Sequence, residues 1–290
     1  MQRFPYDTEV LRVHATSDLS HGATMSGEFP SDLTPRDLRD DLARLRGRYL
    51  DLMVKSLSDT LYDRPSGQAK PAVDSETDRV EGRVLPEVAH TMVGVLRLNN
   101  LRELTERAIV EKVPGHFIET GVWRGGCCIL MKAMLAAHGD THRRVYVADS
   151  FRGLPPPRPE LYPVDRGDQF HTYDQLRVSA DQVRANFSRY GLLDERVVFV
   201  EGFFHETLPR LDAAPFAVIR LDGDMYESTI VALETLYPKL SAGGFVVIDD
   251  YGGIPACRSA VTDFRRTYDI TDEIQEIDWT GVWWRKAGTV

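Results

Sequence analysis

From residue 116 onward, short apolar runs alternate with amphipathic stretches. Such runs are typical of strands buried on both faces, and the stretches between them have the apolar spacing of helices. The alternation predicts an α/β fold in which helices cover both faces of a mostly parallel sheet. The expected strands are 116–120, 144–149, 196–201, 216–222 and 244–249, and the expected helices are 125–138, 179–190, 228–239 and 256–267.

The C-terminal end of the chain departs from this alternation. The run EIQEID is separated from VWWRK by Trp279, Thr280 and Gly281. Two short strands joined by a tight turn that contains glycine form an antiparallel hairpin. We therefore expect a sheet of seven strands, in which five parallel strands are followed by a C-terminal antiparallel hairpin.

The N-terminal part of the chain has a different character. Residues 1–34 are polar and show no period, so we assign them no fold. Apolar residues spaced by four and three predict an amphipathic helix over 35–58, whose apolar stripe could pack on its own domain or on a second subunit. The polar segment 63–83 contains two prolines and predicts a long loop, which we interpret as a lid. A further helix is predicted over 86–110.

Length and composition suit one large catalytic domain with an extension before it. We expect the extension at 1–85 and the domain at 86–290. The formal net charge of -9 argues against nucleic-acid and anionic-membrane partners. Neither a membrane-spanning apolar stretch nor the pattern of a secretion signal is present, so we expect a cytoplasmic protein. The three cysteines, Cys127, Cys128 and Cys257, are interpreted as buried and reduced.

The segment HFIETGVWRGG, residues 116–126, is the most informative candidate site. The expected strand ends in Glu119 and Thr120, and Gly121 follows where a ligand must approach the backbone closely. A dinucleotide fold carries G-x-G-x-x-G with its acid one strand later, whereas here the acid comes first. An acid in this place suits a cation such as S-adenosylmethionine. The alternative is an ordinary glycine-rich turn with a capping acid.

The ends of the next two strands carry further candidate cofactor residues, because ligands bind beyond the carboxyl ends of parallel strands. Asp149 and Ser150 end the second strand, and the Asp149 carboxylate is predicted to accept both ribose hydroxyls. The alternative for Asp149 is a turn or capping aspartate. Gly202 and Phe203 follow the third strand and are expected to receive the adenine.

Three carboxylates, Asp222, Asp249 and Asp250, follow two strands that are expected to be neighbours. Like charges repel, whereas a hard divalent ion such as Mg²⁺ takes oxygen ligands and keeps positions open for a substrate. We predict a Mg²⁺ site here, unless one or two of these aspartates point away and cap helices. Asp222 is also the candidate catalytic base. Asp224 is expected outside the metal ligands, and His205 is an alternative titratable neighbour.

Several of these runs resemble the macrocin O-methyltransferase (TylF-type) family. The resemblance extends from about residue 90 to the C-terminus and implies a class I methyltransferase fold, which is Rossmann-like. It also implies S-adenosylmethionine and Mg²⁺ as cofactors, a deoxysugar hydroxyl on an antibiotic scaffold as acceptor, and a homo-oligomer. The runs are IETGVWRGG, ADSFRGLP, LDGDMYEST, GGFVVIDDYGGIPACRSAV and GVWW. The resemblance implies cofactor roles for Glu119, Gly121, Asp149 and Ser150, metal roles for Asp222, Asp249 and Asp250, and weaker cofactor candidates in Thr91, Met92 and Arg97.

Together these observations predict an O-methyltransferase that acts on a glycosylated natural product. Coordination to Mg²⁺ would lower the pKa of the acceptor hydroxyl and hold its oxygen in line with the S–CH₃ bond. A catechol-like O-methyltransferase is the main alternative, because two adjacent aromatic hydroxyls would also chelate the metal. A non-catalytic S-adenosylmethionine-binding partner protein is a further alternative, and the glycine spacing disfavours a nicotinamide oxidoreductase.

Overall fold

The computed structural model describes residues 35–62, 76–213 and 215–288. The predicted arm, 1–34, and most of the predicted lid loop lie outside these ranges. The chain forms two compact units, 1–41 and 42–290, and the sheet, its helices and the candidate site all belong to the second. The expected division at residue 85 stays a prediction. No helix in the described ranges is long and apolar enough to cross a bilayer.

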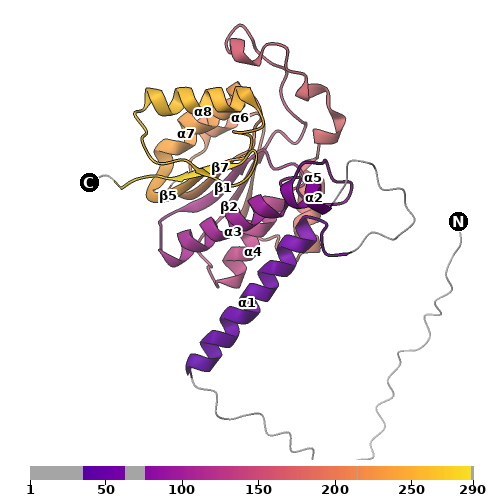
Figure 1. Cartoon of the computed structure of the whole chain (residues 1–290), viewed down its shortest axis with the longest axis vertical. Helices are drawn as coiled ribbons and strands as arrows, with labels where there is room; N and C mark the ends of the chain where they lie inside the picture. The colour runs from indigo at the N-terminus through magenta and orange to yellow at the C-terminus, as the bar shows by residue number, and fades with distance from the viewer. Residues whose placement is uncertain (1–34, 63–75, 214, 289–290) are drawn as a thin grey trace, which may run out of the picture. The chain divides into compact units, whose positions relative to one another are not determined.

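The sheet confirms the predicted architecture (Figure 1). It has seven strands in the order β3-β2-β1-β4-β5-β7-β6. The first five are mutually parallel, and β7 runs antiparallel to both of its neighbours, β5 and β6. The chain moves outward from β1 to β3 and then returns to the other side of β1, so β1 and β4 flank the switch point where ligands bind in such folds. The strands are β1 His116–Thr120, β2 Val145–Asp149, β3 Val197–Glu201, β4 Phe216–Leu221, β5 Leu240–Ile248, β6 Gln275–Glu276 and β7 Val282–Arg285.

Helices cover both faces of this sheet because successive strand residues point to opposite sides. Phe117 belongs to the core cluster that contains residues of α3 and α4, whereas its neighbour Ile118 belongs to the cluster that contains residues of α7 and α8. Figure 1 shows these two helix pairs on opposite sides of the strands. The helices are α1 Pro35–Leu57, α2 Glu76–Glu81, α3 Gly94–Val110, α4 Gly126–Ala137, α5 Ala180–Arg189, α6 Phe204–Thr207, α7 Tyr226–Leu236 and α8 Pro255–Thr267.

The face of helix α1 that is buried against the domain differs from the apolar stripe that the sequence predicted. Leu50, Met53, Val54 and Leu57 are buried in the core, and their spacing is that of one helical face. The predicted stripe comprises positions 38, 42, 45, 49 and 52. Its four leucines remain 49–61% exposed, whereas Tyr49 is partly buried against the core. The leucines of this stripe thus remain exposed, whereas Tyr49 packs on the domain itself, so both predicted alternatives stay open.

Candidate functional site

A cavity of about 420 Å³ opens at the carboxyl ends of β1, β2, β4 and β5. Most of the residues that the sequence singled out line its wall. Thr120 and Gly202 are not on the wall, and Thr120 is completely buried. The predicted residues on the wall are Met92, Glu119, Gly121, Asp149, Ser150, Phe203, Asp222, Asp249 and Asp250, together with Asp224, His205, Thr91 and Arg97.

Gly121 allows the ends of β1 and β4 to meet. Its backbone has φ +82°, and a Cβ atom there would lie 1.6 Å from the backbone oxygen of Asp222. The amide of Gly121 donates to the carbonyl of Ala148, and the amide of Asp222 donates to the carbonyl of Thr120, both at 2.9 Å. A residue without a side chain is therefore required where the glycine turn, residues 119–126, touches the strand end that carries Asp222.

Glu119 lies below this turn and is almost completely buried. Arg220 Nη1 donates to Glu119 Oε1 at 2.5 Å, and Cys128 Sγ donates to Glu119 Oε2 at 2.8 Å. Burial raises the pKa of Glu119, and the Arg220 guanidinium opposes that shift. Arg220 therefore serves as the internal counter-charge of the acid that the sequence assigned to the cofactor.

Asp149 has the turn-holding role that the sequence gave as the alternative, and its ribose-binding role stays a prediction. Its Oδ2 accepts from the amide of Val122 and its Oδ1 from the amide of Phe151, both at 2.8 Å. Burial raises the pKa of Asp149, while these backbone hydrogen bonds act in the opposite direction. A carboxylate oxygen has two lone pairs, so each oxygen that holds the turn can still accept a ribose hydroxyl.

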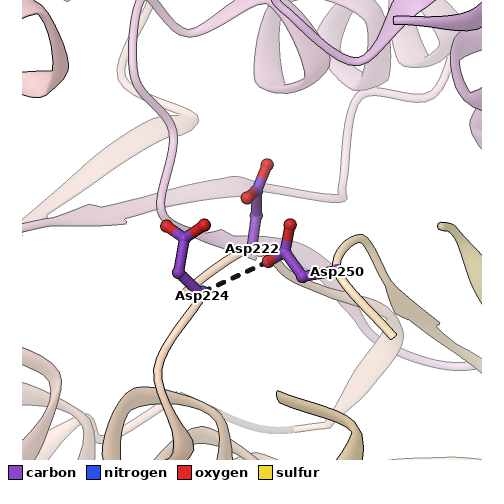
Figure 2. A group of neighbouring side chains, drawn as sticks. All are labelled: Asp222, Asp224 and Asp250. Carbon is purple, nitrogen blue, oxygen red and sulfur yellow. Dashed lines mark hydrogen bonds between the residues drawn. The ribbon is translucent and has the colours of Figure 1, made fainter. Parts of the chain in front are cut away.

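Three aspartates form an acidic cluster beside the glycine turn (Figure 2). Asp222, Asp224 and Asp250 each offer a carboxylate oxygen, and these oxygens lie within 4.8 Å of one another. The backbone amide of Asp224 donates to Asp250 Oδ2 at 3.2 Å. Burial raises the pKa values of Asp222 and Asp250 well above the ordinary range, and repulsion adds to this, from Asp249 at Asp222 and from Asp224 at Asp250. Burial together with Asp249 raises the pKa of Asp224 to about 7.

Asp249, a predicted metal ligand, is bound by two arginines, unlike Asp250. Arg97 Nη1 donates to its Oδ2 and Arg220 Nη2 donates to its Oδ1, and all three side chains are at most 5% exposed. Two guanidinium groups thus neutralise Asp249, whereas no ion pair to Asp224 or Asp250 occurs among the described residues. The cluster and the predicted metal set share Asp222 and Asp250, and Asp224 stands in the cluster where Asp249 was expected.

The donor set of the cluster fits a hard divalent cation. Asp224 and Asp250 have no ion pair among the described residues, and carboxylates that repel one another are stabilised by an ion that binds oxygen ligands. Arg220 also donates to Asp222 Oδ2 at 2.9 Å, so one guanidinium touches acids at the ends of β1, β4 and β5. The i, i+2 spacing of Arg220 and Asp222 places them on the same side of the strand and is a signal that sequence reasoning missed.

The long connection between β2 and α5, residues 150–179, is fastened beside the cluster. Asp165 accepts from the amides of Tyr226 and Glu227, at 2.7 and 2.9 Å, and so caps α7, whose N-cap residue supplies no side-chain hydrogen bond. Arg158 Nε donates to Glu227 Oε2 at 3.0 Å. His205 Nδ1 lies 3.4 Å from Glu227 Oε1, which places this candidate on the same wall. These contacts join segments far apart in sequence, so no local pattern signals them.

The comparisons with known proteins decide the family. Residues 43–286 match the profile described as "Macrocin-O-methyltransferase (TylF)". The chain belongs to the macrocin-O-methyltransferase family. It is accordingly an S-adenosylmethionine-dependent O-methyltransferase with a class I fold, as the resemblance implied.

Named relatives and a solved structure agree with this assignment. A tetracenomycin 4'-O-methyltransferase of Streptomyces olivaceus, named for a dimethoxy-rhamnosyl acceptor, is 54% identical over 83% of this chain and 93% of its own length. Demethyldecarbamoylnovobiocin O-methyltransferase of Streptomyces niveus is 46% identical over 82% of this chain and 93% of its own length. The structure of the O-methyltransferase NovP is 46% identical, has a TM-score of 0.79, and covers 84% of this chain and 100% of its own.

Proposed function

We propose that this enzyme transfers the methyl group of S-adenosylmethionine to a hydroxyl of a deoxysugar on a glycosylated natural product, with Mg²⁺ at the acidic cluster. The observation that carries the proposal is that the glycine turn and the cluster line one cavity and meet through the contact between Gly121 and Asp222. The names of the tetracenomycin, novobiocin and mycinamicin relatives support an acceptor from antibiotic biosynthesis.

The cofactor is proposed to lie across the ends of β1 and β2. Asp149 would accept from the ribose hydroxyls, with Ser150 beside it, and Phe203 would stack on the adenine. The Glu119 carboxylate would attract the cationic end of the cofactor from beneath the turn. Met92, in the segment before α3, would pack on the cofactor. Thr120 and Gly202, which do not line the cavity, would support this wall from behind.

Asp222 and Asp250 are the proposed Mg²⁺ ligands that both the sequence and the cluster favour. Asp224 completes the cluster, and Asp249 would join the ligands only after its arginines release it. When bound, the ion supplies Lewis acidity that lowers the pKa of the acceptor hydroxyl. The residues of the chain would hold the ion and the acceptor at the same end of the sheet.

The proposed transfer is a direct displacement. The acceptor oxygen would form a bond to the methyl carbon of S-adenosylmethionine while the S–CH₃ bond breaks, and the sulfur would keep that electron pair, which leaves neutral S-adenosylhomocysteine. The hydroxyl proton passes to a carboxylate. Asp222 is the proposed acceptor of this proton. Because Arg220 already binds its Oδ2 at 2.9 Å, the ion would have to share that oxygen so that Oδ1 stays free to take the proton.

Methyl transfer from S-adenosylmethionine to a rhamnosylated polyketide tests the proposal. We expect turnover with this acceptor, loss of turnover on addition of EDTA, and recovery with excess Mg²⁺. Asp250→Asn should lose the response to Mg²⁺, whereas Asp181→Asn, at a side chain that is 96% exposed, serves as the matched control. Equal turnover with and without EDTA, or turnover confined to a catechol, would contradict the proposal.

We also propose that the enzyme is a homo-oligomer that pairs through α1. Leu42, Leu45, Tyr49 and Leu52 follow the alternating three and four spacing of a coiled-coil seam, and the three leucines are exposed. A second copy supplies an identical seam, as a two-fold interface requires. Light scattering should give a dimer or larger assembly, and Leu45→Asp should reduce it to the monomer mass. A monomeric wild-type protein would contradict this.

A further inference from the structure

Trp279 is a large exposed aromatic side chain on the wall of the cavity. It lies in the turn before β7 and is 42% exposed. None of the roles assigned above to the cofactor or the cation uses it. An aromatic ring that stays exposed inside a binding cavity forgoes much of the stabilisation that burial gives, so a ligand that covers it gains that stabilisation.

The Trp279 ring is fixed in place. Its indole Nε1 donates to the carbonyl of Glu81 at 2.9 Å. The guanidinium of Arg83 lies 4.7 Å from the ring centroid. The ring packs against Gly253 so closely that a Cβ atom there would come within 3.0 Å of Cζ3. A side chain held in this way loses little conformational entropy when a ligand binds.

The ring stands at the cation end of the cavity. Gly253 lies three residues beyond Asp250, and its amide donates to Thr280 Oγ1 at 3.0 Å. Thr280 Oγ1 in turn donates to the carbonyl of Asp249 at 3.0 Å. The turn that carries Trp279 is thus bound to the end of β5, where the acceptor hydroxyl must lie if Asp250 holds the cation.

We propose that Trp279 is the acceptor platform and that its indole packs against the C–H face of the deoxysugar that receives the methyl group. This inference rests on the proposed function. A deoxysugar has a methyl group where a hexose has CH₂OH, or a methylene where it has CHOH, so its apolar surface is enlarged and suits an aromatic ring. Arg83, whose side chain is 44% exposed, supplies hydrogen-bond donors at the rim for the remaining sugar oxygens.

Trp123 provides a matched counterpart on the wall of the same cavity. Its indole Nε1 also donates to a backbone carbonyl at 2.9 Å, that of Gln175, and Arg124 lies 4.0 Å from its ring centroid. It follows Gly121 in the glycine turn and lines the same cavity. Because the two tryptophans are held in the same way, we expect Trp123 to contact the cofactor and Trp279 to contact the acceptor, which allows their effects to be compared directly.

The test uses two calorimetric titrations. The first adds S-adenosylhomocysteine to the free protein. The second adds each of two rhamnosides, which share the sugar but differ in aglycone, to protein already loaded with S-adenosylhomocysteine and Mg²⁺. We expect Trp279→Ala to raise the Kd of both rhamnosides by about tenfold, ~1.4 kcal/mol, with the Kd of S-adenosylhomocysteine unchanged. Trp279→Leu should act like the alanine variant, and Trp279→Phe should restore most of the affinity. Trp123→Ala should raise the Kd of S-adenosylhomocysteine and leave the Kd of the rhamnosides unchanged. Tyr268→Ala, at a residue that is 53% exposed and outside the cavity, should change neither Kd.

The outcomes separate this inference from the function on which it rests. If the wild-type protein methylates a rhamnoside but Trp279→Leu and Trp279→Phe bind it with the same Kd as each other, the proposed role of Trp279 is wrong and the proposed function stands. A loss confined to one aglycone, or an equal loss of S-adenosylhomocysteine, would also overturn the platform. If the wild-type protein methylates no glycoside, the proposed function itself fails. The leucine and phenylalanine variants keep the comparison decisive if Trp279→Ala does not fold, because both retain an apolar side chain against Gly253.

Discussion

Replacement of Gly121 by alanine tests the contact that joins the glycine turn to the acidic cluster. Gly139, just after α4, is a matched control, because both glycines have positive φ, +82° and +66°. Alanine in this left-handed region costs roughly 1–2 kcal/mol at either position. A Cβ atom at Gly139 would meet nothing within 4 Å, whereas at Gly121 it would lie 1.6 Å from the backbone oxygen of Asp222.

The structure gives the size of the disturbance at Gly121. The contact must open to at least 3.0 Å, and therefore by 1.4 Å (3.0 minus 1.6), before an alanine can be accommodated. Such a shift breaks the 2.9 Å hydrogen bond from the Asp222 amide to the Thr120 carbonyl. Overpacking, the lost hydrogen bond and the left-handed backbone together should cost roughly 3–5 kcal/mol of unfolding free energy. A displacement of about 1 Å at reacting groups can also slow catalysis by ~100-fold.

Urea unfolding and S-adenosylhomocysteine calorimetry on both variants provide the assay. Gly139→Ala should lose roughly 1–2 kcal/mol and bind the cofactor product like the wild type. Gly121→Ala should lose at least twice as much stability, and its remaining folded fraction should bind S-adenosylhomocysteine at least tenfold more weakly. If the two variants match in both measurements, the close approach between β1 and β4 does not control the site and the reasoning is refuted.

Three further substitutions test the surroundings of the site. Arg220→Met should lower the unfolding free energy by about 3–5 kcal/mol, because it leaves buried acids without their counter-charge; an unchanged urea midpoint would contradict this. Asp165→Ala should lower the free energy of unfolding by about 1–2 kcal/mol, because it uncaps α7, and should raise the KM of the acceptor. Asp181→Ala should do neither, and equal urea midpoints for the two variants would refute the capping role of Asp165. Asp250→Asn should melt no lower than the wild type without metal, because one repelling charge is removed, and should lose the rise in Tm that Mg²⁺ produces; a retained rise would exclude Asp250 as a ligand.

The fold could be predicted because its signals are local. Apolar runs of β-strand length, each followed by a helical period, fixed the order of the elements, and the turn at Gly281 indicated the antiparallel end of the sheet. Register then follows from burial, since a shift by one residue would turn Phe117 and Ile118 to the wrong faces. The carboxyl ends of the strands could be predicted from the same apolar runs. For this reason the sequence predicted that Asp222 and Asp250 lie close together.

The arrangement of charges inside the site could not be predicted from local pattern. Arg97 and Asp249 are 152 residues apart in sequence, and their ion pair depends on how α3 packs beneath the end of β5. The same holds for Asp165, which caps a helix that begins 61 residues later. The exposed stripe of α1 shows a related limit. Its spacing predicted an apolar face, but Leu50 and its neighbours, which periodicity alone did not single out, form the face that is buried.

Calorimetric titration of S-adenosylmethionine and S-adenosylhomocysteine, with and without Mg²⁺, on the wild type and on Asp222→Asn tests the central claim most directly. It is followed by methyl transfer to the rhamnosylated polyketide. We predict that both proteins bind the cofactor and that only the wild type shows Mg²⁺-dependent turnover. Full Mg²⁺-dependent turnover by Asp222→Asn, or a wild-type protein that does not bind S-adenosylmethionine, would contradict the account.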